Sequence, residues 1–290
     1  MSAIAYITDS KMLELHRLNA NKTMNFWRLS LNTSFSDFGI GDLVFFLSKD
    51  KIYLNKKEKG IVGYGKLKNF YTASPKKMWK DFKTENGYNT YEEFSEAIIK
   101  VSKGYELPQK ISSLYLGDVT FFQHPIYLSE CGVNISNNVE SYIYIKPENT
   151  VIKLLEFAKN NIDIWSSSEN QVDIIDTQQL ECAIKIAFSN IGDYIKNSKE
   201  LNSAYRKMKK LQANNEACTF IGKSKLNLML VNERDVLIVL YNNKNIDKRI
   251  LLGQCELYKR YIGRNYPNAY KLYFKTSNGD KETDKLLNKS

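Results

Sequence analysis

Short β-like runs punctuated by glycine fill residues 25–89, and this stretch constrains the fold more than any other. A glycine-rich turn precedes an apolar strand at 43–47, and a second strand at 60–67 carries glycines that let another backbone or a ligand come close. Two of the chain's three tryptophans, Trp27 and Trp79, fall in the same stretch. Aromatic residues interleaved with Arg, Ser and Asn on a small β scaffold can hold a flat ring, because the ring stacks on them while polar groups read its edge. The stretch therefore predicts a ring-binding β module.

Around this module, the first half alternates strands with helices. The β-rich runs predict strands at 3–8, 26–31, 111–122 (a strand pair around Gly117-Asp118) and 142–145. Helical spacing or capping residues predict helices at 11–20, from Ser74-Pro75, and from the capping box Thr90–Glu93. This order predicts an α+β chain whose first domain is a small β-barrel with inserted helices.

The second half has a different pattern. Helices are expected at 151–160, from an N-cap at Asp176 through Tyr194, at 196–211 and at 254–262, and strands at 226–230, 236–241 and 269–274. We therefore predict four parts: a first domain (1–148), a helix and linker (149–170), a smaller α/β or α+β domain (171–276) and a mobile polar tail (277–290).

Composition narrows the class of protein. The chain has 290 residues with a net charge of +10, 43% apolar and 26% charged residues, which is typical of a soluble globular protein. No run is long enough for a membrane span, the N-terminus lacks a basic signal-peptide segment, and the four cysteines are scattered, so a cytoplasmic location is expected. The positive charge favours nucleic acid as partner. A proteome that is rich in Lys and Asn would explain the charge equally well. There is no GxxxxGK[ST], GxGxxG, GxSxG or HExxH motif, so no cofactor is expected from these sources.

A resemblance to a known family rests on spaced motifs within the first half. These are Asn25-Phe26-Trp27-Arg28, Gly41-Asp42-Leu43, Ile61-Val62-Gly63-Tyr64-Gly65, Trp79, Asn86-Gly87, Leu116-Gly117 and Pro125-Ile126-Tyr127. Up to about residue 148 the sequence resembles the PUA-like/EVE-like domain at the N-terminus of bacterial HNH-type, modification-dependent restriction endonucleases. The resemblance implies a PUA-like barrel that holds a modified base in an aromatic pocket. The pocket candidates that it implies are Trp27, Arg28 and Ser30, with Phe70, Tyr71 and Asn86 behind them.

The same aromatic residues have a structural alternative. We expect Trp79, Phe45 and Phe46 in the barrel core. Trp27 is expected either in the core or in the base-binding pocket. The HNH nuclease itself is absent, because the only histidines are His16 and His124 and none follows residue 124.

The second half faintly resembles a degenerate PD-(D/E)xK restriction-endonuclease fold. Glu181 would lie on its leading helix, and Gln254 with Tyr258 on the trailing one. The strand positions that need metal-binding carboxylates read Asn227-Leu-Met-Leu and Val239-Leu-Tyr-Asn, which is too little negative charge for Mg²⁺. If the fold is right, either the copy is inactive or its site is built from Glu233 and Asp235, and Mg²⁺ is expected only in the second case, with no other metal. We expect instead a domain that contacts DNA or binds a partner.

Basic residues on the helix at 196–211 are candidates for phosphate contact, although a solvated helix face is the commoner meaning of such a run. The candidates are Lys199, Arg206, Lys207 and Lys210. The leading hypothesis is a DNA-binding protein of bacterial restriction or anti-phage defence that senses a modified base in duplex DNA, alone or beside a separate nuclease or motor subunit. The alternatives are a modification-dependent endonuclease that cuts through the second domain, and an RNA-binding regulatory module.

Overall fold

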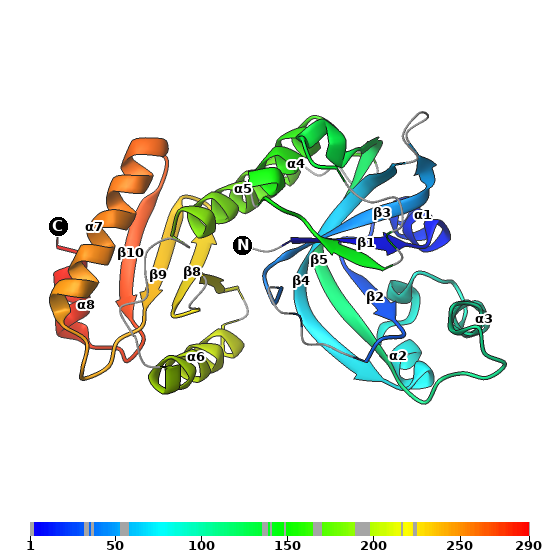
Figure 1. Cartoon of the computed structure of the whole chain (residues 1–290), viewed down its shortest axis with the longest axis horizontal. Coiled ribbons are helices and arrows are strands. Elements are labelled where there is room, and N and C mark those ends of the chain that lie inside the picture. The colour runs from blue at the N-terminus through cyan, green and yellow to red at the C-terminus, as the bar shows by residue number, and fades with distance from the viewer. Residues whose placement is uncertain are drawn as a thin grey trace. The chain divides into compact units, whose positions relative to one another are not determined.

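The computed structural model describes residues 3–31, 35, 38–52, 58–134, 139, 141–147, 149–164, 170–188, 198–215, 217–222 and 225–289. The chain divides into two compact units, Ser2–Ile175 and Asp176–Ser290, which we treat separately (Figure 1).

The first unit is built mainly from strands. Its elements are β1 (Ala3–Thr8), α1 (Ser10–Leu18), β2 (Met24–Arg28), β3 (Leu43–Ile52), β4 (Lys59–Ala73), α2 (Pro75–Phe82), η1 (Lys83–Asn86), α3 (Tyr91–Ser102), β5 (Ile111–Ile126), η2 (Leu128–Cys131), β6 (Tyr142–Tyr144) and α4 (Asn149–Lys159). The strands pair in the order β2-β5-β4-β3-β1-β6. β1 runs parallel to β3, and the other neighbours are antiparallel.

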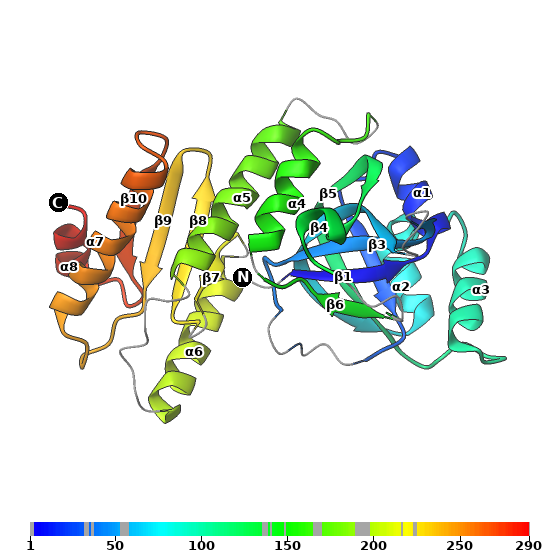
Figure 2. The ribbon, with the colours of Figure 1, turned by 45° about the horizontal axis from the view of Figure 1, so that its top comes forward.

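This sheet is strongly curled (Figure 2). β1 and β2 stand four places apart in the strand order, yet the rings of Tyr6 and Phe26 lie 5.0 Å apart, centroid to centroid. No pairing joins β2 to β6 within the described residues. The predicted α+β class is confirmed, while closure of the curled sheet into the predicted barrel is not seen among the described residues.

Two long strands make the curl possible. We expected a strand pair around Gly117-Asp118, but β5 is one strand of 16 residues that bends there, with φ of +52° at Asp118. Its pairing with β4 is interrupted by register shifts. At Gly63 of β4, a Cβ atom would lie only 2.5 Å from the carbonyl oxygen of Thr120, so the close crossing of the two strands needs glycine.

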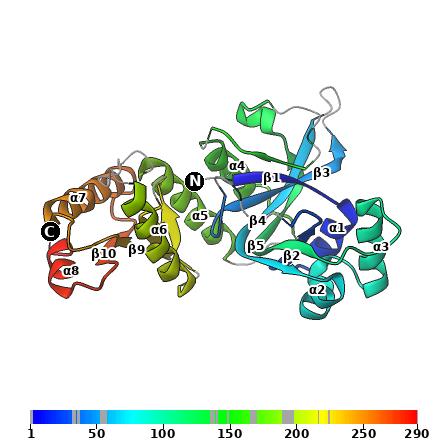
Figure 3. The ribbon, with the colours of Figure 1, turned by 60° about the horizontal axis from the view of Figure 1, so that its bottom comes forward.

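Local capping signals explain where the helices begin. Ser74 Oγ accepts a hydrogen bond from the Lys77 amide at 3.3 Å, with Pro75 as the first helical residue of α2. Thr90 Oγ1 accepts from the Glu93 amide at 3.2 Å, which starts α3 as predicted. Helices α1, α2 and α3 gather at one end of the first unit (Figure 3).

The core of the first unit contains Phe45 and Phe46, both fully buried, as predicted. The four cysteines, which were expected to be reduced thiols, are free and buried. Burial raises the pKa of Cys255 to about 12 and, together with nearby Glu130, that of Cys131 to about 11, so these two thiols stay protonated at neutral pH.

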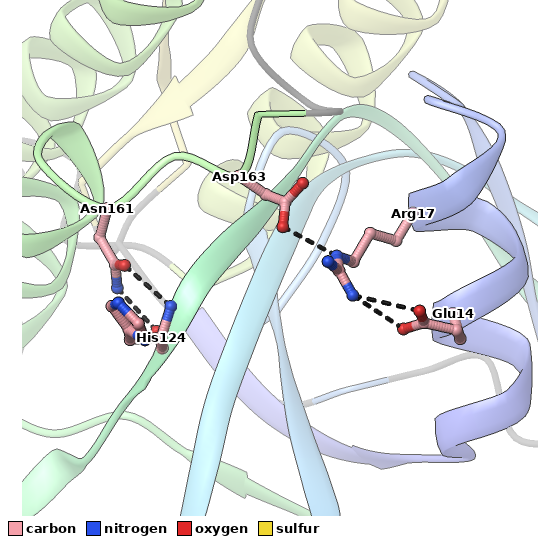
Figure 4. Close-up of polar contacts among 5 residues, drawn as sticks. All are labelled: Glu14, Arg17, His124, Asn161 and Asp163. Carbon is pink, nitrogen blue, oxygen red and sulfur yellow. Dashed lines mark hydrogen bonds and ion pairs between the residues drawn. The ribbon is translucent and has the colours of Figure 1, made fainter.

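Polar contacts fasten the segment after α4 to the rest of the first unit (Figure 4). Asn161 exchanges two hydrogen bonds with the backbone of His124, at 2.9 and 2.7 Å. Asp163, which is buried, accepts a hydrogen bond from Arg17 Nε at 2.8 Å, and Arg17 also pairs with Glu14. These contacts bind residues 161–163 to β5 and α1, so α4 and the segment that follows it belong to the first unit.

The second unit is a four-stranded sheet with helices on both faces. Its elements are α5 (Gln171–Phe188, which begins in the first unit), α6 (Ser198–Ala213), β7 (Thr219–Ile221), β8 (Asn227–Asn232), β9 (Asp235–Leu240), α7 (Lys248–Asn265), β10 (Lys271–Thr276) and α8 (Lys281–Leu287). The strand order is β10-β9-β8-β7, with β10 parallel to β9 and the other pairs antiparallel.

Two predictions for the second half were wrong. Asp176 lies inside α5 and does not cap it, because the helix starts five residues earlier. Residues 281–287 form α8, where we expected a mobile tail: Asp280 caps this helix and Leu287 is fully buried. Residues 189–194, predicted to continue α5, and 165–169, predicted as linker, lie outside the described residues. None of the helices in the described ranges is both long and apolar enough to cross a membrane.

Candidate functional site

Arg28 ends strand β2 with its side chain buried. Its Nε donates a hydrogen bond to Ser112 Oγ at 3.1 Å, across the β2–β5 pair in which these residues are in register. Ser112 Oγ donates in turn to the carbonyl of Ser30 at 2.5 Å. The guanidinium carbon lies 4.8 Å from the centre of the Phe35 ring, within cation–π range. The fold therefore holds a fixed positive charge against an aromatic face.

Phe35 belongs to a set of five half-buried aromatic rings that contact one another and come from four parts of the chain. Phe35 stacks with Phe70 of β4 at 6.1 Å and meets Tyr142 of β6 edge-on at 5.4 Å. Tyr142 stacks on Tyr6 of β1 at 5.6 Å and contacts Tyr144 at 5.8 Å. We call the set Tyr6, Arg28, Phe35, Phe70, Tyr142 and Tyr144 the Arg28 cluster.

The tyrosine hydroxyls add hydrogen-bonding capacity to the Arg28 cluster. Burial raises the pKa of Tyr142 above its ordinary value, and the neighbouring Tyr144 adds to the shift, while the charge of Arg28 opposes it. The phenol is therefore protonated at neutral pH and can donate a hydrogen bond. Flat rings, hydroxyl groups and a guanidinium are the groups that bind a planar heterocycle by stacking and by hydrogen bonds to its edge.

Of the six residues predicted to bind a base, the structure brings Arg28 and Phe70 together. Trp27 is buried, and its indole packs edge-on against Phe94 at 5.7 Å, which places it in the core. Asn86 is fully buried: its Oδ1 accepts from Asn25 Nδ2 at 2.8 Å and its Nδ2 donates to the carbonyl of Lys83 at 2.8 Å.

The remaining two predicted base-binding residues also lie apart from the cluster rings. Tyr71 donates a hydrogen bond to the carboxylate of Asp81 and packs edge-on against Phe82 of α2 at 5.1 Å. The ring of Tyr71 therefore contacts Phe82, whereas the ring of its neighbour Phe70 contacts Phe35. Ser30 has an exposed side chain, and only its backbone carbonyl touches the network, through Ser112.

Sequence reasoning missed Tyr6, Phe35, Tyr142 and Tyr144. The i, i+2 spacing of Tyr142 and Tyr144 was a usable signal, because such residues share one face of a strand. The position of β6 beside β1 gave no signal in the sequence, because a pairing across more than 130 residues depends on the whole sheet.

The three carboxylates considered for catalysis do not form a metal site. Glu181 is buried in α5, whereas Glu233 and Asp235 are exposed at the turn between β8 and β9. Within the described ranges, no three His, Cys, Asp or Glu side chains lie close enough together to hold a metal ion. The second unit therefore offers no support for Mg²⁺-dependent cleavage in these ranges.

Asn227, at the strand position where a nuclease of that class needs a carboxylate, has a structural role. Its Oδ1 accepts from the Tyr241 amide at 3.1 Å, and its Nδ2 donates to the hydroxyl of Tyr258 at 3.4 Å. Tyr258 itself is buried among the rings of Phe188 and Phe274. These residues tie β8 to β9 and α7.

The four predicted phosphate contacts all lie on α6 with exposed side chains. They are Lys199, Arg206, Lys207 and Lys210. The opposite side of α6 is anchored by Ala204 and Met208, both fully buried against β8 and neighbouring residues. This arrangement keeps the basic side chains outward.

Together these features define an α+β protein of two units, the first carrying an aromatic and cationic cluster on a curled sheet. No protein-family model matches the chain, and no curated protein matches it, so the resemblance to HNH-type endonucleases has no support from either source.

The chain is similar to crystal structures of ASCH from Zymomonas mobilis and of two single-residue variants of that protein. The identity is 11%, the matches cover 53–54% of this chain and 94–98% of those chains, and the TM-scores are 0.36–0.38.

Proposed function

We propose that this chain is a nucleic-acid-binding protein whose first unit holds one base of DNA against the Arg28 cluster. The observation that carries the proposal is the buried guanidinium of Arg28, fixed by Ser112 and lying over Phe35 among half-buried rings. Five rings from four segments give aromatic faces on which a base can stack. The guanidinium and the tyrosine hydroxyls supply donors for its edge.

The free energies of stacking and of an arginine contact are compatible with a base that is taken out of a duplex. Extruding a base costs a few kcal/mol, stacking on an aromatic side chain returns about 1–3 kcal/mol, and a well-placed arginine contact to a base edge returns about 1–3 kcal/mol. One stacking contact and one arginine contact therefore offset the cost only approximately. A base that is already weakly paired, or one that offers an extra group to the cluster, is favoured.

The finer proposal is that the base is modified and that the protein serves bacterial restriction or anti-phage defence. Its support is the resemblance of the ordered motifs in residues 25–127 to modification-dependent restriction systems. Recognition by this chain, with cleavage by a separate subunit, agrees with the absence of a metal-ligand group from the described ranges.

Binding to matched duplexes tests this function. Duplexes carrying cytosine, 5-methylcytosine, 5-hydroxymethylcytosine or its glucosylated form are compared at one salt concentration, about 150 mM, because phosphate contacts depend steeply on salt. We expect one modified duplex to bind about tenfold more tightly, and Phe70→Ala to abolish the preference because it removes a stacking ring. Tyr71→Ala is the matched control: it removes a ring from the next residue of β4 that has its own contacts with Asp81 and Phe82.

Two results would contradict this proposal. Equal binding of all four duplexes, with the same affinities in the Phe70→Ala variant, would show that the cluster does not read a base. Stronger binding of single-stranded RNA than of every duplex would favour the RNA-binding alternative.

A further inference from the structure

The positive charge of the chain is concentrated in the second unit. Residues 176–290 contain 21 Lys and Arg against 12 Asp and Glu, a net charge of +9 out of +10 for the whole chain. The preceding 175 residues contain 21 basic and 20 acidic residues and are almost neutral. Sequence-independent attraction to phosphate therefore resides in the second unit, whereas the Arg28 cluster lies in the first.

Among the described residues, one face of the sheet in the second unit is covered only in part. Phe274 of β10 and Ile238 of β9 point to the face that α5, α7 and α8 bury. Side chains alternate along a strand, so their neighbours point to the opposite face. On that opposite face, α6 packs over Phe220, Leu228 and Val239.

The β10 part of this second face is exposed and carries an aromatic residue between two lysines. Lys271, Tyr273 and Lys275 are all exposed, and Tyr273 has a relative accessibility of 44%. They are in register with Asp235, Leu237 and Val239 of β9. Asp235 balances the charge near Lys271, while Lys275 lies opposite an apolar residue. We call Lys271, Tyr273 and Lys275 the β10 triad.

We propose that the β10 triad, with the basic side of α6, binds an unpaired nucleic-acid strand. Alternate residues of a strand stand about 7 Å apart, so a base can stack on Tyr273 while the lysines on either side reach the phosphates that flank it. Helix α6 supplies further charge, since it carries five basic residues and a single acidic one, Glu200. Proteins that bind single strands without sequence preference combine aromatic rings, on which the bases stack, with a basic surface that contacts the backbone. This proposal does not depend on the Arg28 cluster.

The test uses the full chain and a fluorescent oligothymidylate of about 12 nucleotides, a length within the range of known single-strand sites. Anisotropy titrations at several salt concentrations give the affinity and its salt dependence. We expect Tyr273→Ala to weaken binding about tenfold and Tyr273→Phe to bind as the wild type does, because stacking is retained. The double variant Lys271→Ala/Lys275→Ala should lower the slope of log K against log salt by about 1.4, since each contact to a single strand contributes about 0.7.

A matched control removes the same charge elsewhere in the unit. Lys281 and Lys285 are exposed on α8, which packs against the other face of the sheet through Leu287. The double variant Lys281→Ala/Lys285→Ala should keep the wild-type slope. The replaced side chains are exposed, so all variants should melt as the wild type does.

The proposal is overturned if Tyr273→Ala binds the oligothymidylate normally, or if the α8 control loses as much slope as the β10 variant. The two proposals can fail separately. The modified-base preference is tested with Phe70→Ala, whereas binding of the single strand is tested with Tyr273→Ala.

Discussion

Replacing Gly87 with alanine is expected to lower the free energy of unfolding of the first unit by about 3 kcal/mol. Gly87 follows η1 with φ of +86°, a conformation that costs an alanine about 1–2 kcal/mol. An added Cβ would also lie 2.2 Å from Cγ of Met12 in α1. Met12 is buried, so its side chain has little room to withdraw, and overpacking of this kind adds about 1–3 kcal/mol.

Gly132→Ala separates the two causes. Gly132 has a similar φ, +82°, but nothing lies within 4 Å of a Cβ placed there. It should therefore show only the backbone cost, about 1–2 kcal/mol, in urea unfolding followed by circular dichroism. If Gly87→Ala lowered the free energy of unfolding no more than Gly132→Ala does, Gly87 would not lie as close to Met12 of α1 as described.

The stability of the first unit is expected to fall by about 3 kcal/mol between pH 6.5 and pH 4 because of His16. His16 is fully buried, and its Nδ1 lies 2.9 Å from the side-chain Nδ2 of Asn21, which suits a neutral ring that accepts a hydrogen bond. Burial lowers the pKa of His16 from 6.5 to about 4. Between these values the unfolded chain binds a proton that the folded chain does not, so the contribution is fully present above pH 6.5 and is lost as the pH falls to 4.

Urea unfolding at a series of pH values measures this loss. Carboxylates also titrate at low pH, so the quantity of interest is the difference between the wild type and His16→Gln, which cannot take up the proton. The advantage of the wild type over His16→Gln should shrink by about 3 kcal/mol over that range. A constant difference between wild type and His16→Gln across the range would show that His16 protonates as freely in the folded protein as in the unfolded chain.

Signals within a few residues of sequence predicted most of the helices and strands. The elements that were predicted wrongly depend on contacts with distant parts of the chain. Ser74 and Thr90 mark helix starts because their hydroxyl groups satisfy nearby amides, which is visible within four residues of sequence. The continuous bend of β5 at Asp118 resembled a turn, because glycine followed by aspartate is also the sequence of a hairpin. Helix α8 was read as a tail, since its short polar sequence is stabilised by the burial of Leu287 against β10 and α7.

The candidate site was predictable in part for the same reason. Arg28 and Phe70 lie in strands that the sequence identifies, and both reach the cluster. Trp27 was ambiguous because adjacent residues of a strand face opposite sides, and Trp27 takes the side of Phe94 while Arg28 takes that of Phe35. Tyr142 enters the cluster only because β6 pairs with β1, which no local pattern encodes.

Photocrosslinking tests the central claim, that the Arg28 cluster receives a base, most directly. A duplex with 5-iodocytosine or 5-iodouracil at a single position is irradiated with the protein, and the linked peptide is identified by mass spectrometry. The account predicts crosslinks to Tyr6, Phe35, Phe70, Tyr142 or Tyr144, which disappear in competition with the preferred modified duplex. Crosslinks confined to Trp79 and Tyr91, or to the second unit alone, would contradict it.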